Sequence, residues 1–213
     1  MIIRKESADT RESELIHSIL LNTAIKISEP LHEALEVIGP FEIPIRTDQS
    51  LIHFLAKIIV GQQLSTKAAL SIWSRVETAI NASGLRMSEY FCEVNSDEMR
   101  LCGVSKNKIK ALISIGTADK KGELCSKSLG LLDHAERSRK LLRLFGIGQW
   151  TCDMTSMFYY QSPDIWPIND VTVQRQFGRL IGQRKPETAI QQFVPYRTYL
   201  ALAMYKIADS MPK

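Results

Sequence analysis

Apolar residues recur at helical spacing along almost the whole chain, and this pattern limits the fold more than any other feature. Leu31, Leu35 and Ile38 follow the i, i+4, i+7 spacing of one helix face and stop at Gly39-Pro40, which ends helices. The same spacing predicts further helices in segments 51–58, 66–80, 96–103, 107–115, 136–144, 149–160, 171–181 and 197–208. No alternating strand pattern of any length competes with them. The sequence therefore predicts an all-α fold, with 41–46 as an extended, proline-punctuated linker.

The size and composition of the chain fit a globular protein built from long elements. Its 213 residues suit one large domain or two small interleaved ones, and its 11 glycines and 8 prolines are few for that length. Cys92, Cys102, Cys125 and Cys152 form no CxxC pair, which indicates buried thiols in a reducing compartment. The N-terminus lacks the apolar region of a signal peptide, and charged residues interrupt every apolar run. We therefore expect no membrane association.

Positive charge is concentrated in one part of the chain. Residues 100–143 hold eleven basic and four acidic residues, a net charge of +7, whereas residues 1–50 carry a net charge of −4. A basic block inside a globular body favours a polyanionic partner. A solvated helix face would give the same pattern, so charge alone leaves both interpretations open.

A short segment occurs twice, as Arg100-Leu-Cys-Gly-Val-Ser105 and Arg143-Leu-Phe-Gly-Ile-Gly148. Each copy ends one helix, turns at a glycine and starts another, which predicts two helix-turn-helix hairpins. In the second copy, Gly146 and Gly148 directly precede a helix whose unpaired N–H groups and positive dipole end form an anion site. With the basic block upstream, a DNA phosphate is the natural anion. A plain helix–helix connection is the alternative.

Five segments together resemble the helix-hairpin-helix DNA glycosylases, over residues 30–208. They are, in chain order, Ile59–Ala69, Cys102–Lys108, Leu144–Thr151, Trp166-Pro167 with Asp170, and Pro195–Tyr199. The closest branch is the alkylated-base class, the DNA-3-methyladenine glycosylase II type. The resemblance implies two helical subdomains flanking a cleft, at 46–135 and 136–213. Residues 1–45 would pack with the C-terminal subdomain.

The resemblance also assigns a catalytic centre. Asp170 falls at the family's catalytic carboxylate, although Asn169-Asp170 before an apolar helix is also an ordinary N-cap. Trp150 and Met154 lie on one apolar helix face, which a substrate pocket and the core can share. Tyr205 falls at another pocket aromatic, with core packing as the alternative.

The remaining roles concern DNA and an ion. Gln62 or Gln63 would fill the gap left by the flipped nucleotide, and the sequence does not decide between them. A DNA phosphate would be held by backbone amides at Gly146, Gly148 and Thr151. An alkali cation, Na⁺ or K⁺, would be held by main-chain carbonyls at Leu142, Leu144 and Ile147.

The departures from the family narrow the expected chemistry. Strand-cutting branches carry a Lys where this chain has Trp150, so the Schiff-base nucleophile is missing. No Cys follows Cys152, so the family's iron–sulfur loop is missing as well. We therefore expect a monofunctional DNA glycosylase of base excision repair, which hydrolyses the N-glycosidic bond of alkylated purines in double-stranded DNA and requires no cofactor.

Several points stay open at this level. The lesion range includes 3-methyladenine, 7-methylguanine, hypoxanthine and ethenoadenine, because pocket shape depends on residues that the sequence does not place. The alternatives are a non-catalytic helix-hairpin-helix DNA-binding protein and a glycosylase for other lesions. We expect a monomer, located in the cytoplasm at the nucleoid of a bacterium or in the nucleus of a eukaryote.

Overall fold

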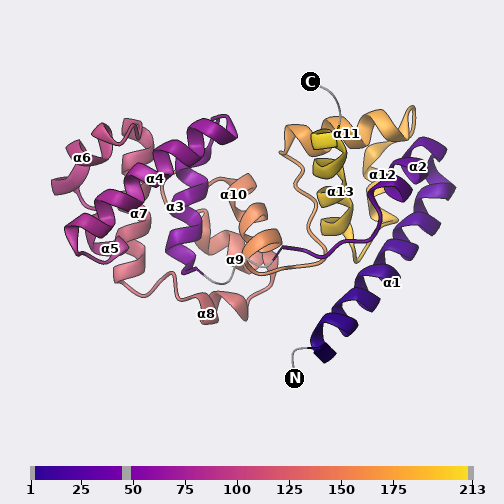
Figure 1. Cartoon of the computed structure of the whole chain (residues 1–213), viewed down its shortest axis with the longest axis horizontal. Helices are drawn as coiled ribbons and strands as arrows, with labels where there is room; N and C mark the ends of the chain where they lie inside the picture. The colour runs from indigo at the N-terminus through magenta and orange to yellow at the C-terminus, as the bar shows by residue number, and fades with distance from the viewer. Residues whose placement is uncertain (1–2, 45–48, 211–213) are drawn as a thin grey trace. The chain divides into compact units, whose positions relative to one another are not determined.

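The computed structural model describes residues 3–44 and 49–210, with side chains from residue 11 onward, and within these ranges it contains helices and no strand (Figure 1). The all-α prediction is confirmed. None of the helices in these ranges is long and apolar enough to cross a membrane. The helices are α1 (Ile3–Ile27), α2 (Glu29–Ile38), α3 (Leu51–Gly61), α4 (Thr66–Ser83), α5 (Met87–Tyr90), α6 (Ser96–Leu101), α7 (Lys106–Lys120), α8 (Ser126–Gly130), α9 (His134–Leu141), α10 (Gln149–Met154), α11 (Val171–Ile181), α12 (Pro186–Gln191) and α13 (Arg197–Ser210).

The chain divides into two compact units, each described here by itself. Residues 1–45 and 156–213 form one unit, and residues 46–155 form the other. The N-terminal segment thus belongs to the same unit as the C-terminal residues. The hairpin of α9 and α10 belongs to unit 46–155, whereas we expected it in a subdomain that begins at residue 136. The reason is that α10 bonds to Gln62, directly after α3, and the turn before α10 bonds to Ser114 of α7.

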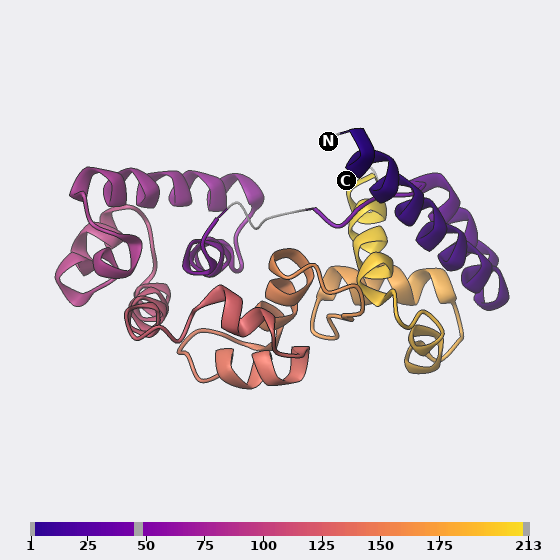
Figure 2. The same cartoon turned by 90° about the horizontal axis from the view of Figure 1, so that it is seen from below.

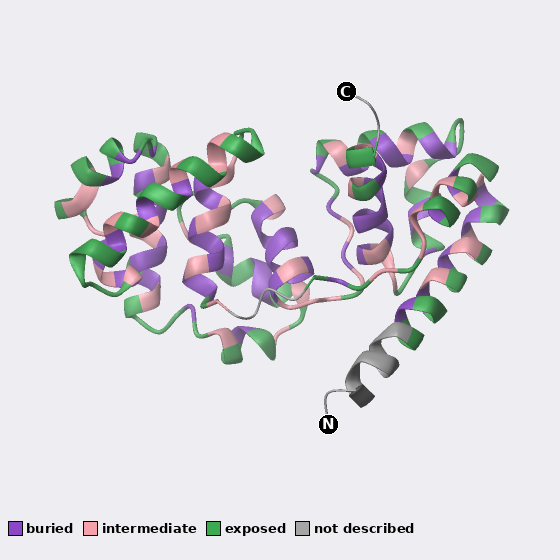
Figure 3. Cartoon of the chain, viewed as in Figure 1, coloured by how far each residue is buried: buried purple, intermediate pink, exposed green. Residues whose placement is uncertain are grey.

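The unit of residues 1–45 and 156–213 is built on α2, α11 and α13, which pack against one another. α1 lies beside α2 in both views (Figure 1, Figure 2). It turns Ile16, Leu20, Ala24 and Ile27 inward, and all four are buried (Figure 3). The spacing of these residues is helical.

In the unit of residues 46–155, α3 is buried along most of its length and packs on α4 and α7. α7 continues past Gly116, where we expected the helix to end. A Cβ at Gly116 would lie 2.9 Å from the Cβ of Phe91. Gly116 therefore permits close packing of α7 against the segment after α5, and it does not terminate the helix.

Both copies of the repeated segment form helix-turn-helix hairpins, as predicted. Gly103 turns at φ +96° between α6 and α7, and Gly146 turns at φ +82° between α9 and α10. These positive values favour glycine. The predicted helix 149–160 is not regular throughout, because α10 changes into a π-helical turn at Thr155–Tyr159.

Candidate functional site

Asp170 is a buried carboxylate at the start of a helix. It is the N-cap of α11, where its Oδ1 accepts a hydrogen bond from the Val173 N–H at 2.9 Å. Its Oδ2 accepts a hydrogen bond from the Tyr205 hydroxyl of α13 at 2.6 Å. The residue is only 8 % exposed. The capping role and a fixed negative charge are therefore compatible at this position.

The loop that leads to Asp170 is fastened to the start of α13. Arg197 donates to Asp164 from Nε at 2.6 Å and from a terminal nitrogen at 2.8 Å. The Thr198 hydroxyl donates to the Ser162 carbonyl at 2.6 Å and accepts from the Ile165 N–H at 2.9 Å. Arg197 and Thr198, which belong to the Pro195–Tyr199 motif, thus join the loop to the start of α13.

Asp164 ties the loop before Asp170 to α13, and sequence reasoning did not single it out. Burial on its own would raise the pKa of its carboxyl group, but hydrogen bonds from Arg197 and the charge of that residue outweigh burial and hold the pKa below its usual value. The two residues are 33 positions apart. No local pattern could have paired them.

The two glycines of the α9–α10 hairpin have different surroundings. A Cβ at Gly146 would collide with the Cβ of Ala111 in α7, and the neighbouring Phe145 N–H donates to Ser114 Oγ of α7 at 3.1 Å. Gly148 has open space around its Cβ position. Gly146 therefore seats the hairpin on α7, whereas Gly148 leaves the surface in front of α10 uncovered.

The N-terminus of α10 has amides without a side-chain cap. Gly148 is the N-cap and has no side chain with which to accept from them. The first turn of the helix therefore receives no side-chain hydrogen bond from its N-cap residue. Trp150 is half-buried there, and Met154 is buried in the unit. Thr151 is 1 % exposed, and its hydroxyl accepts from Gln62 Nε2 at 3.3 Å.

The three carbonyls expected to hold an alkali cation lie in the turn between α9 and α10. The Leu144 carbonyl accepts from the Ile147 N–H at 3.2 Å, which leaves one of its two lone pairs for an ion. Ile147 is buried, and Leu142 is exposed. Neutral oxygen donors suit a hard alkali cation. The described residues contain no cluster of His, Cys, Asp or Glu that could hold a metal.

The turn after α3 holds the two glutamines differently. Lys108 of α7 donates from Nζ to the carbonyls of Val60 and Gln62, each at 2.8 Å, and burial lowers the pKa of this Lys. Gln62 is tied to Thr151 as described above. Gln63 is exposed and has φ +57°, which is uncommon for a residue with a Cβ. Gln63 therefore stands at the tip of this turn.

The hairpin itself contains a buried carboxylate that sequence reasoning also missed. Asp153 of α10 is 2 % exposed and accepts from Gln149 Nε2 at 2.8 Å. Its Oδ1 also lies 3.2 Å from Nε2 of His134, the first residue of α9. Asp153 thus connects the starts of both hairpin helices. The i, i+4 spacing of Gln149 and Asp153 is the only sequence signal for it.

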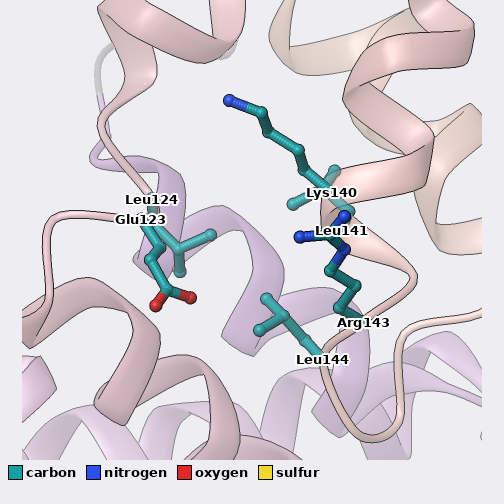
Figure 4. Close-up of a pocket in the computed structure, with 6 residues that line it drawn as sticks. All are labelled: Glu123, Leu124, Lys140, Leu141, Arg143 and Leu144. Atoms are coloured by element: carbon teal, nitrogen blue, oxygen red, sulfur yellow. The ribbon is translucent and has the colours of Figure 1, made fainter.

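A cavity of about 310 Å³ lies beside the turn that follows α9 (Figure 4). Lys140 and Arg143 stand on one side and Glu123 on the other, with leucine side chains between them. Neither cation forms an ion pair with any residue that the structure describes. The hairpin therefore carries two cations, Lys140 and Arg143, that face this cavity without a direct ion pair among the described residues.

Residues 56–193 match the family of HhH-GPD superfamily base excision DNA repair proteins. The chain belongs to this superfamily. The matched range contains the turn after α3, the α9–α10 hairpin and Asp170, and Tyr205 lies beyond it.

Among relatives of this HhH-GPD protein, the DNA-3-methyladenine glycosylase 1 of Schizosaccharomyces pombe is 27% identical over 212 residues, covering 93% of this chain and 92% of the relative. The crystal structure of a Bacillus halodurans DNA-3-methyladenine glycosidase superposes with a TM-score of 0.72 at 29% identity, covering 88% of this chain and 90% of that one. The S. pombe 3-methyladenine DNA glycosylase in complex with abasic DNA gives a TM-score of 0.76 at 23% identity, over 92% and 99% of the two chains.

Proposed function

We propose that this HhH-GPD protein is a monofunctional DNA glycosylase of the DNA-3-methyladenine glycosylase II type, which removes alkylated purines from double-stranded DNA. The observation that carries the proposal is Asp170, a buried carboxylate fixed at a helix start in a chain with Trp150 where strand-cutting relatives have a lysine. The similar proteins of S. pombe and B. halodurans, both named for 3-methyladenine, support it.

The proposed chemistry follows from where charge develops. As the N-glycosidic bond breaks, the sugar becomes an oxocarbenium-like cation, and the fixed Asp170 carboxylate stabilises that charge and orients the attacking water. A 3- or 7-alkylpurine already carries positive charge, so it leaves without first being protonated. The half-buried Trp150 ring favours such a cation by about 0.5–2 kcal/mol through stacking and cation–π attraction.

The proposed DNA-binding site lies at the N-terminus of α10. The backbone amides at Gly148 and in the first turn of α10 would bind one phosphate, with Lys140 and Arg143 adding positive charge beside it. We also propose that the backbone amides of Gly146 and Thr151 contribute to binding this phosphate. An alkali cation at the carbonyls named above would stiffen the turn that carries them.

The first test of this function is base release from methylated duplex DNA. We expect free 3-methyladenine as product and an intact strand that carries an abasic site, because Trp150 stands where the strand-cutting branches have a lysine. Chromatography identifies the base, a denaturing gel reports the strand, and borohydride should trap no protein–DNA adduct. Duplex binding without any base release would favour the non-catalytic DNA-binding alternative, and a trapped adduct would contradict the monofunctional one.

We further predict that Gln63, and not Gln62, fills the gap left by the flipped nucleotide. Gln63 is exposed at the tip of its turn, whereas the Gln62 side chain bonds to Thr151. Opening a duplex costs a few kcal/mol, and less where the lesion is already mispaired. Gln63→Ala should therefore slow base release from a well-paired lesion more than from a mispaired one.

The comparison variant for this prediction is Gln62→Ala, which removes the same side chain from the neighbouring position. Single-turnover base release from paired and mispaired substrates is the measurement. Equal rates of Gln63→Ala and wild type on both substrates would rule out the wedge role of Gln63.

A further inference from the structure

The Asp170 carboxylate is held by two helices, one at each oxygen. Oδ1 accepts from the Val173 N–H in α11, and Oδ2 accepts from the Tyr205 hydroxyl in α13 at 2.6 Å. That distance lies in the short range of hydrogen bonds to charged oxygens. Bonds at both oxygens fix the plane of the carboxylate as well as its position. The Tyr205 hydroxyl is therefore directed at Asp170.

The same helix also holds the segment that carries Asp170. At its start, α13 is joined to the preceding loop by the Arg197–Asp164 pair and by Thr198. Tyr205 lies two turns further along α13. α13 thus fixes both the loop before Asp170 and the carboxylate itself.

We propose that Tyr205 is a positioning residue, which orients the Asp170 carboxylate toward the sugar through this hydrogen bond. This differs from the expectation that Tyr205 forms an aromatic wall against the damaged base. The inference rests on the proposed function, because it concerns the carboxylate that would face the sugar cation.

The two roles predict different responses to substitution. A positioning residue acts on the sugar cation, which is the same for every lesion, so its loss lowers the rate by one factor for all bases. A stacking residue acts on the base, so Phe would replace Tyr fully and Leu would not. Tyr205→Phe removes only the hydroxyl group, so it should slow base release if Tyr205 is a positioning residue and not if it is a stacking residue.

The experiment measures single-turnover release of 3-methyladenine, 7-methylguanine and hypoxanthine by Tyr205→Phe and Tyr205→Leu. We expect Tyr205→Phe to lower every measurable rate by about the same factor, roughly tenfold, and Tyr205→Leu to add little to that loss. Tyr199→Phe is the matched control, because it removes a hydroxyl from the same helix, where the Tyr199 ring contacts Phe41 and Tyr196. Its rates should equal those of the wild type.

A double substitution tests whether Tyr205 acts through Asp170. In an Asp170→Asn background, Tyr205→Phe should change the residual rate by less than about twofold, because no carboxylate remains to be oriented. If Tyr205→Phe lowers the rate of base release in the Asp170→Asn background by as much as it does in the wild type, the inference is wrong. The inference is also wrong if Tyr205→Phe releases base at the wild-type rate while Tyr205→Leu releases it slowly.

Failure of the proposed function has a different signature. If the wild-type protein releases none of the three bases, the proposed function is wrong, and thermal unfolding then decides the role of Tyr205. Tyr205→Phe should lower Tm more in the wild type than in Asp170→Ala, where the acceptor is gone. Equal shifts in Tm in the two backgrounds would show that the hydroxyl is not committed to Asp170 and would reject the inference.

Discussion

Asp170→Asn is expected to lower the rate of base release by about 10²–10³-fold, with DNA binding retained. The substitution removes the negative charge that would face the sugar cation. It keeps the size of the side chain and an oxygen that accepts from the Val173 N–H, so the N-cap of α11 should be retained, although the Tyr205 hydroxyl loses its charged acceptor. Single-turnover release of 3-methyladenine measures the rate, and thermal unfolding checks the fold.

The matched control is Asp133→Asn, the same chemical change at another helix N-cap. Asp133 caps α9 by accepting from the Glu136 N–H at 2.8 Å. Its base release should match that of the wild type. If Asp170→Asn releases base as fast as the wild type does, Asp170 is only a helix cap and the proposed catalytic role is wrong.

Gly148→Val is expected to weaken binding to every duplex, damaged or not, by about 10- to 100-fold. Loss of hydrogen bonds to a charged phosphate accounts for this range, at about 1.5–3 kcal/mol each. The backbone at Gly148 has φ −105° and ψ 176°, which valine adopts without strain, and its Cβ position is open. The fold should therefore hold while the valine side chain covers the amides at the start of α10. Fluorescence anisotropy with undamaged and abasic duplexes measures the affinity.

Two other glycines make this prediction specific. Gly178→Val places the same side chain at an open position in α11 and should leave affinity unchanged. Gly146→Ala meets both a positive φ and Ala111, so it should lower the melting temperature. Wild-type affinity in Gly148→Val would contradict the proposed phosphate site.

The remaining affinity of the Gly148→Val variant for DNA should depend less steeply on salt concentration than that of the wild type, because fewer phosphates are engaged.

Local features of this fold were readable from the sequence, and long-range ones were not. The capping role of Asp170 depends on a residue three positions away, and the hairpin turn depends on Gly146 itself. By contrast, 35 residues separate Tyr205 from Asp170, and only the packing of α13 on α11 brings them together. The prediction that a helix ends at Gly116 was also wrong. In sequence, a glycine that ends a helix cannot be distinguished from one that lets a neighbouring segment pack closely against the helix.

The prediction that the α9–α10 hairpin belongs to the C-terminal subdomain was wrong for a related reason. Its helices are short, and their sequence does not tell which neighbour they pack against. The bonds that decide this run from Thr151 to Gln62 and from Phe145 to Ser114, over 89 and 31 residues. Helical periodicity predicts elements and their buried faces, but it carries no information on such partners.

One face of α7 carries both turns that we propose to contact DNA. Lys108 holds the turn with Gln63, while Ala111 and Ser114 seat the hairpin, and these three residues are spaced by three along the helix. If both proposed contacts hold, α7 sets the distance between the phosphate bound at the hairpin and the nucleotide next to Gln63. An insertion of one residue between Lys108 and Ala111 would rotate the two supports relative to each other by about 100°. In the proposed arrangement, such a protein would place Gln63 at a different nucleotide from the one that wild-type Gln63 contacts.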